Sequence, residues 1–457
     1  MSEAETDPVD RMSGFESLMW ELERDPQLTS AFANLTIFDR PPDRRTFRAR
    51  MERATLEVPR LRQRVVTGLN PLDRPQWVDD PDFDIDHHLR WTHLGHDADV
   101  SDLYELAATL SGQPFDRQRP LWEFVTIEGL PGGRAAMLQR LHHTITDGEG
   151  GIRLSVQFLD FERHPEPKPE ASPRPRRRRQ EADPAEEPSE AGKSWWGQLG
   201  ELPQRGSELT AMARSTFRQV RVGQRRSPLW TERSLSRWFG TTVLSLDDVR
   251  SAARHLGGSV NDLFIAGAVD AAGEIHRAAG RPVEELRVSM PVSTRHDRSA
   301  GGNAFSPTQM LAPTGPMSPQ ERFTALHGIL SRIKEERAIG ALEGAANAAS
   351  ILPSAAIVRT GQHLAGAVDF VCSNVRAAPF DLFIGGAFME ANYPIGPLAG
   401  TAFNLTTMSY RGWLYLGLTV DLAAVTDPDG LLEQLDRSYD ALLAAGGVTE
   451  RARPERA

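Results

Sequence analysis

The stretch LHHTITDG, residues 141–148, places two neighbouring histidines before a turn that contains Asp and Gly. The residues leading into it, RAAMLQRLH at 134–142, are apolar and partly alternating, which predicts a strand. Catalytic side chains often protrude from loops at strand ends, and a neutral imidazole can take a proton from an alcohol. His142 and His143 are therefore candidate general bases, although two histidines alone also fit a structural or a metal-binding pair.

The end of this stretch indicates a tight connection to a helix. Asp147 can orient the loop by binding a backbone N–H or a nearby arginine, and Gly148 tolerates a positive φ that turns the chain sharply. The residues GIRLSVQFL at 151–159 then show helical spacing of apolar side chains. The pattern predicts a strand, a loop carrying polar chemistry and a helix in succession.

Composition excludes several classes of protein. The 457 residues carry 52 basic and 62 acidic side chains, a formal net charge of −10, whereas nucleic-acid-binding domains usually have a basic surplus. The single cysteine, Cys372, allows no disulfide within the chain and no cysteine-based metal site. The N-terminus is acidic rather than a secretory signal, and no apolar run reaches the roughly 20 residues that span a bilayer. We expect a cytoplasmic protein that is soluble or lies on a membrane surface.

A charged, proline-rich segment at 163–192 divides the chain. It has almost no large apolar residues and cannot bury enough surface to offset its chain entropy. We expect an N-terminal half over 1–160, a linker plus amphipathic segment over 161–233, and a C-terminal half over 234–457. Helical and strand patterns alternate in both halves, which predicts an α/β (α+β layered) fold with two domains.

Capping and turn residues mark where several helices and strands are expected to begin or end. Asp43 is a suitable N-cap for a helix, and small and apolar residues around most of the circumference at 260–278 predict a buried helix. Further expected elements are a strand at 287–292, a helix capped by Ser318, Pro319 and Glu321, strands at 405–409 and 413–420 joined at Arg411 and Gly412, and a helix running from Asp427 and Pro428 to Gly446.

HHTITDG matches the pattern HHxxxDG, and the chain resembles the CoA-dependent acyltransferase superfamily. This group includes chloramphenicol acetyltransferase, nonribosomal peptide condensation domains, polyketide-associated acyltransferases and bacterial wax ester synthase/diacylglycerol acyltransferases. Further matches, in order from about residue 110 to 430, resemble the last family. They are PLW at Pro120, Leu121 and Trp122, ND at Asn261 and Asp262, PVSTR at 291–295 with GN at 302–303, SNV at 373–375, and SYRG at 409–412 with Gly417 and Asp421.

Two places depart from the family pattern. After SNV the family often has a Pro-Gly turn, whereas this chain has RAAP at 376–379. Near the N-terminus the family often carries an aspartate before its first helix, and here Glu16 stands in the nearest comparable place. Neither departure touches the histidines, but both bear on which acceptor fits.

The resemblance implies two chloramphenicol-acetyltransferase-like domains with an active-site tunnel between them. It implies that His143 is the general base and that His142 packs or fixes the loop. The donor would be acyl-CoA, a co-substrate rather than a bound cofactor, and the acceptor a lipid alcohol, either diacylglycerol or a fatty alcohol. Neither a metal nor a covalent intermediate is required, because the thioester is already activated.

The remaining motif residues have expected roles with alternatives. Asp147 would pair with Arg295, or else orient His143 as in a catalytic triad. Oxyanion donors would be backbone N–H groups near Gly148 and the side chain of Asn261. Asn261 and Asp262 could also simply start a helix, Ser373 and Asn374 could line the acyl channel or end a strand, and Pro120, Leu121 and Trp122 fit core packing better than substrate contact.

Other functions remain open at this level. A condensation-type or polyketide-associated acyltransferase would take its acyl group from a carrier protein, but the chain has no carrier module and its PLW, ND and SNV elements favour the lipid family. A binding protein that lost catalysis is disfavoured by the intact HHxxxDG. Cys372 as a nucleophile is disfavoured because its apolar context offers no activating base.

Residues 195–230 interleave tryptophans and aliphatic side chains with six arginines, and Pro203 divides the run. Such a basic amphipathic segment can lie on an anionic membrane or on a lipid droplet. Alternatively, its apolar face packs on the protein's own domains.

Overall fold

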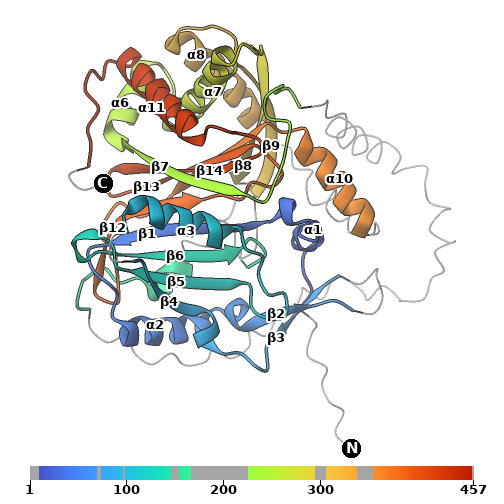
Figure 1. The fold of residues 1–457 in the computed structure, drawn as a ribbon, viewed down its shortest axis with the longest axis vertical. Helices are drawn as coiled ribbons and strands as arrows, with labels where there is room; N and C mark the ends of the chain where they lie inside the picture. Colours follow the sequence, from blue (N-terminus) through green and yellow to red (C-terminus); the bar gives the residue numbers. More distant parts are fainter. Residues whose placement is uncertain are drawn as a thin grey trace, which may run out of the picture.

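The computed structural model describes residues 10–68, 74–95, 98–145, 154–165, 225–293, 305–336 and 354–454. Within these ranges the chain forms two six-stranded sheets and a small two-stranded sheet, with helices packed around them (Figure 1). The expected mixed α/β architecture with two sheet-rich domains is confirmed.

The first sheet carries the histidine strand near its centre, in the order β11-β12-β1-β6-β5-β4. Its strands are β11 (Phe383–Ile384), β12 (Ala387–Ile395), β1 (Ala31–Phe38), β6 (Ala135–His142), β5 (Trp122–Glu128) and β4 (Leu89–His93). Strands β4 and β5 pair in parallel, whereas β12, β1, β6 and β5 pair antiparallel in succession. All eight residues of β6 are buried, as expected of a strand in the middle of a covered sheet.

Two helices flank the first sheet. Helix α2 (Arg44–Glu57) begins at the predicted N-cap, Asp43, whose carboxylate accepts a hydrogen bond of 2.8 Å from the backbone N–H of Thr46. Helix α3 (Val100–Gly112) lies between the two large sheets and contacts both β1 and β7 (Figure 1). The space between the sheets is therefore partly filled by a helix of the N-terminal half.

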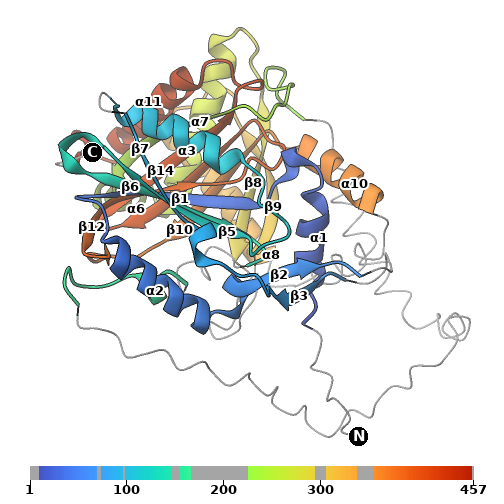
Figure 2. The ribbon, with the colours of Figure 1, turned by 60° about the horizontal axis from the view of Figure 1, so that its bottom comes forward.

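The second sheet belongs to the C-terminal half and has the order β7-β14-β13-β10-β8-β9. Its strands are β7 (Arg237–Ser245), β14 (Trp413–Asp421), β13 (Phe403–Tyr410), β10 (Phe370–Arg376), β8 (Glu285–Ser293) and β9 (Phe305–Pro313). Helices α6 (Leu246–His255), α7 (Val260–Ala278), α8 (Pro319–Glu336) and α11 (Pro428–Ala445) cover its face away from the first sheet (Figures 1 and 2). Small residues permit this packing, since a Cβ on Gly267 of α7 would lie 2.2 Å from the ring of Tyr439 on α11.

Strand β12 joins the two halves. In the sequence, β10 precedes and β13 follows the short β11–β12 hairpin, and both lie in the second sheet, whereas β12 pairs with β1 in the first. The backbones meet closely where β12 passes β14, because a Cβ on Gly417 would lie 1.9 Å from the carbonyl oxygen of Pro394. A side chain at position 417 would push the two sheets apart. The domain boundaries expected at 160 and 234 stay a prediction. The sequence did not indicate that β12, which lies beyond residue 234, pairs in the first sheet.

Most predicted elements are confirmed. The buried helix expected at 260–278 is α7, and the strand expected at 134–142 is β6. Ser318 and Glu321 make the expected reciprocal cap, and α11 runs from its N-cap Asp427 to its C-cap Gly446. The strands expected at 405–409 and 413–420 lie within β13 and β14, which form a hairpin around Arg411 and Gly412.

The central linker and most of the amphipathic segment lie outside the described residues. Residues 225–230, at the end of that segment, are described and form no helix. Trp230 is 2% exposed and packs in the core of the second half, where its ring meets His276 and Phe403 edge-on. Among the helices that the structure describes, each is too short or too polar to cross a membrane.

Candidate active site

The turn after β6 presents the two histidines. His142 is the last residue of β6, opposite Ala31 of β1, and its backbone N–H donates to the carbonyl of Leu121 at 3.0 Å. His143 follows, and its N–H donates to the carbonyl of Ser30 at 3.2 Å. The N–H of Ile145 then closes the turn on the carbonyl of His142 at 3.0 Å. Neighbouring strands thus hold the backbone of both histidines from both sides.

The imidazole of His142 is fully buried and its contacts involve both ring nitrogens. Nε2 lies 2.7 Å from a carboxylate oxygen of Glu23. Nδ1 lies 2.7 Å from the hydroxyl of Thr144 and 3.1 Å from its backbone N–H. A ring held in this way is suited to fixing the loop, the role that the resemblance implies for the first histidine.

The imidazole of His143 is more accessible. It is half-buried and lies against the ring of Phe32, with centroids 4.5 Å apart and planes tilted by 34°. A ring that is partly accessible beside an aromatic side chain can meet a substrate and exchange a proton with it. Of the two histidines, His143 is thus the one whose surroundings suit a general base.

Glu23 is a member of this cluster that the sequence did not reveal. It is the C-cap of α1 (Gly14–Leu22), and one of its carboxylate oxygens accepts hydrogen bonds from the Thr29 hydroxyl at 2.7 Å and the Ser30 N–H at 3.2 Å. Burial alone would raise the pKa of Glu23, but its contact with His142 and the hydrogen bonds from Thr29 and Ser30 hold it below its ordinary value. The carboxylate is therefore ionised at neutral pH.

No sequence pattern connects Glu23 with His142, because only the docking of α1 beside the strand end brings them together. The acidic residue singled out from the sequence, Glu16, instead completes a capping box at the start of α1, where its carboxylate accepts the Ser13 N–H at 2.7 Å. The nearest signal in the sequence was thus a helix cap.

The PLW element lies directly beside the histidines. Pro120, Leu121 and Trp122 are all buried, and Trp122 stands opposite Leu141 in the β5–β6 pair. The indole N–H of Trp122 donates to the carbonyl of Leu61 at 2.8 Å. These contacts anchor the strand that leads into the histidine turn.

The structure also brings together Asn261, at the start of α7, and Asn374, on β10. The side-chain amide of Asn374 donates to the Asn261 side-chain oxygen at 3.3 Å. Strand β10 pairs with β8 only through Phe370 and Val371, so Ser373 and Asn374 follow the point where that pairing ends. Ser373 is half-buried and Asn374 exposed, which leaves both polar groups accessible.

Asp262 serves the helix end. Its carboxylate accepts the Ser259 N–H at 2.8 Å in a capping box and lies 2.9 Å from Nδ1 of His327. The cap half of the expectation is confirmed, and a substrate role for Asp262 stays a prediction. The other predicted motif residues, Asp147, Gly148 and Arg295, lie outside the described residues.

Cys372 sits inside the second core, with 2% of its surface exposed. Burial raises the pKa of its thiol, which keeps it protonated and unreactive. Within the described ranges, no group of three or more His, Cys, Asp or Glu side chains gathers as metal ligands would.

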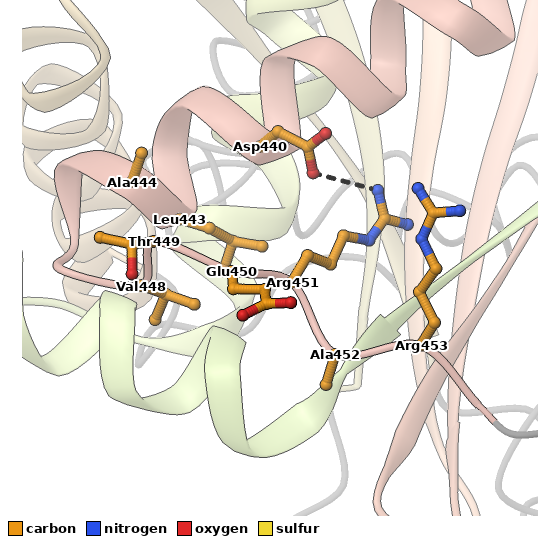
Figure 3. A pocket seen from close by; sticks show the side chains of 9 residues that line it. All are labelled: Asp440, Leu443, Ala444, Val448, Thr449, Glu450, Arg451, Ala452 and Arg453. Carbon is orange, nitrogen blue, oxygen red and sulfur yellow. Dashed lines mark hydrogen bonds and ion pairs between the residues drawn. The ribbon is translucent and has the colours of Figure 1, made fainter.

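A cavity of about 840 Å³ lies apart from the predicted site, between the end of α11 and the C-terminal tail (Figure 3). An ion pair of 3.2 Å between Arg451 and Asp440 crosses one side of it. Its lining consists of Asp440, Leu443, Ala444, Val448, Thr449, Glu450, Arg451, Ala452 and Arg453. Since none of the predicted site residues lines it, this cavity has no evident part in the chemistry of the histidine turn.

Comparisons with known proteins match two domains of one family to this chain. Residues 12–264 match the wax ester synthase/diacylglycerol acyltransferase catalytic domain, and residues 301–443 match the C-terminal domain of the same family. A putative diacylglycerol O-acyltransferase of Mycobacterium tuberculosis is 32% identical over 467 aligned residues, covering 97% of this chain and 94% of the relative. A probable diacylglycerol O-acyltransferase of the same species is 26% identical, covering 92% of each.

Solved structures show the same fold. The wax ester synthase/diacylglycerol acyltransferase from Marinobacter aquaeolei is 21% identical, with a TM-score of 0.67 over 96% of this chain and 100% of that one. The first condensation domain of the calcium-dependent antibiotic synthetase is 16% identical, with a TM-score of 0.63 over 98% of this chain and 99% of that one.

Proposed function

Because the chain belongs to the wax ester synthase/diacylglycerol acyltransferase family and is an acyl-CoA-dependent acyltransferase, we propose that it esterifies a lipid alcohol by a general-base mechanism centred on His143. The proposed acceptors are diacylglycerol, which would yield triacylglycerol, and long-chain fatty alcohol, which would yield wax ester. The names of the relatives from Mycobacterium tuberculosis favour diacylglycerol.

The observation that carries the mechanism is the contrast between the two imidazoles. The ring of His142 is sealed from solvent between Glu23 and Thr144, whereas that of His143 is partly accessible. A base must reach the hydroxyl from which it takes a proton, and only the second ring meets that condition.

The proposed reaction is a direct transfer in two proton movements. His143 removes the hydroxyl proton of the acceptor while that oxygen attacks the thioester carbonyl carbon, giving a tetrahedral oxyanion. The carbon–sulfur bond then breaks, and the protonated His143 returns its proton to the departing CoA sulfur. No covalent intermediate with the protein and no metal is needed, since the thioester is already activated.

Oxyanion stabilisation is proposed for Asn261 and for backbone N–H groups near Gly148. The Asn374 amide donates to the Asn261 oxygen, which leaves the Asn261 amide hydrogens for another acceptor. Such a donor typically contributes about 10²–10³ in rate. Ser373 and Asn374 are proposed to line the acyl path in a tunnel between the two halves, and Asp147 to pair with Arg295.

The decisive experiment is turnover of palmitoyl-CoA with a diacylglycerol and with a long-chain alcohol. We expect His143→Ala to lower kcat by about 10²–10⁴-fold, the usual range for a general base. A matched control is His87→Ala, because His87 is exposed beside the first sheet. Full ester formation by His143→Ala would refute the mechanism, and activity only with palmitoyl-carrier protein would instead favour a condensation-type enzyme.

We also propose that the protein works in the cytoplasm, on the inner face of the membrane or on lipid droplets, where its lipid substrates collect. The support is the arrangement of tryptophans and arginines at 195–230. Trp230, at the end of this run, packs in the protein's own core, so any membrane contact would come from residues before it.

A further inference from the structure

Glu23 contacts both Ser30 and His142, the two residues that hold the proposed catalytic turn in place. One carboxylate oxygen accepts the N–H of Ser30, and the carbonyl of the same Ser30 accepts the N–H of His143 at 3.2 Å. The other carboxylate oxygen lies 2.7 Å from Nε2 of His142. A single side chain therefore contacts the ring of the first histidine and the backbone that holds the second.

The contacts of His142 settle which of its nitrogens carries the proton. The backbone N–H of Thr144 can only donate, and it points at Nδ1 from 3.1 Å. Nδ1 must then be the acceptor, so in the neutral ring the proton lies on Nε2, the nitrogen 2.7 Å from the Glu23 carboxylate. The ionised carboxylate thus selects one tautomer of His142, and that tautomer in turn orients Thr144 at the start of the turn.

We propose that Glu23 is a positioning residue of the acyl transfer reaction, which holds His143 in place through His142 and Ser30. The inference rests on the proposed function of His143 as the base. It deepens that function, because the first histidine of the motif becomes the middle of a Glu23–His142–Thr144 chain rather than a packing residue alone.

Glu23 is itself held by its surroundings. Helix α1 packs against α10 (Ser354–Gly366), and the two lie side by side in both views (Figures 1 and 2). The amide of Gln362 on α10 donates to Asp25 at 2.6 Å, and Arg117 donates to the carbonyl of Trp20 at 2.7 Å. Because these contacts fix the helix end that carries Glu23, the carboxylate can hold the turn in one position.

Replacing Glu23 by glutamine tests the charge with almost no change of shape. A carboxylate accepts on both oxygens, whereas an amide has one acceptor and one donor. If the amide oxygen serves Thr29 and Ser30, the amide nitrogen faces the Nε2 proton of His142. If the amide is turned over, its nitrogen faces the N–H of Ser30. Either orientation sets two donors against each other, so the turn must shift or His142 must change its tautomer.

We expect Glu23→Gln to lower kcat by about 10²-fold, the order of loss for a catalytic group misplaced by about 1 Å, with KM for palmitoyl-CoA little changed. Glu23→Asp keeps the charge on a shorter side chain and should recover part of the activity. The matched control is Glu21→Gln, the same change on the same helix, where the carboxylate pairs with Arg24 at 2.7 Å. This control should keep wild-type kcat.

A spectroscopic measurement separates positioning from general damage. In protein labelled with ¹⁵N-histidine, the ring signals of His142, assigned with a His142→Gln variant, should report the Nε2–H tautomer in the wild type and a changed state in Glu23→Gln. Wild-type kcat in Glu23→Gln, unchanged ring signals, or an equal loss in Glu21→Gln would each overturn the inference. If His143→Ala also remains active, the proposed function itself fails. If His143→Ala is inactive, only the role of Glu23 is refuted.

Discussion

Replacing His88 by asparagine is expected to change how the stability of this protein depends on pH. His88 is 3% exposed, stacks on Trp122 with centroids 4.5 Å apart, and donates from Nδ1 to the Trp122 carbonyl at 2.7 Å. Burial, the largest cause, lowers the pKa of His88 from 6.5 to about 4. The ring is therefore neutral in the folded protein under conditions where it would be charged in the unfolded chain.

The sign follows from proton binding. Between pH 6.5 and about 4 the unfolded chain binds a proton at His88 that the folded protein does not, so the free energy of unfolding falls as the pH falls. A pKa unit corresponds to about 1.4 kcal/mol, so the shift amounts to about 3 kcal/mol once both states have titrated. About 2–3 kcal/mol of this is already lost at pH 4.5. Above pH 7 the contribution is fully present.

The assay is urea unfolding of the wild type and His88→Asn at pH 7.5 and at pH 4.5. Asparagine can donate to the Trp122 carbonyl but does not titrate in this range. The variant should be less stable at pH 7.5, and the gap should shrink by about 2–3 kcal/mol at pH 4.5. His255→Asn, at an exposed position on helix α6, should follow the wild-type pH dependence. Parallel stability curves for His88→Asn and the wild type would refute the reasoning.

Two further predictions concern the cysteine and the membrane. Cys372→Ala should keep wild-type kcat, and native protein should resist iodoacetamide until it is unfolded, because the thiol is buried and protonated; loss of turnover in this variant would revive a nucleophilic cysteine. In flotation with vesicles containing anionic lipid, wild-type protein should rise with the vesicles, and a variant with Arg205, Arg214 and Arg218 changed to Glu should remain in the dense fraction. Equal flotation of the two proteins would remove the membrane proposal.

The sequence was sufficient to predict features that depend on residues close together in the chain. Helix caps such as Asp43 and Asp427 carry their own hydrogen-bonding partners three residues away, and α7 shows its burial in its run of small and apolar side chains. The HHxxxDG motif, with its companion elements in order, is sufficient to identify the family.

The sequence was weaker where one residue type serves two purposes. Asn261 and Asp262 both suit a helix start, and only the structure separates them: the Asp262 carboxylate is used by the Ser259 N–H, whereas Asn261 faces Asn374. The sequence likewise does not distinguish the roles of His142 and His143, because both are histidines at neighbouring positions. One ring turns into the protein toward Glu23, and the other is half-buried beside Phe32.

Local chemistry along the chain thus determined the elements, the family and the motif to which we assign the reaction, because caps, periodicity and motif spacing act over a few residues. Tertiary structure alone decided that β12 joins the first sheet, that Gly417 must accommodate the backbone at Pro394, and that Glu23 stands behind His142. These arrangements depend on which surfaces bury one another, and the packing of distant segments leaves no periodic trace in the order of residues.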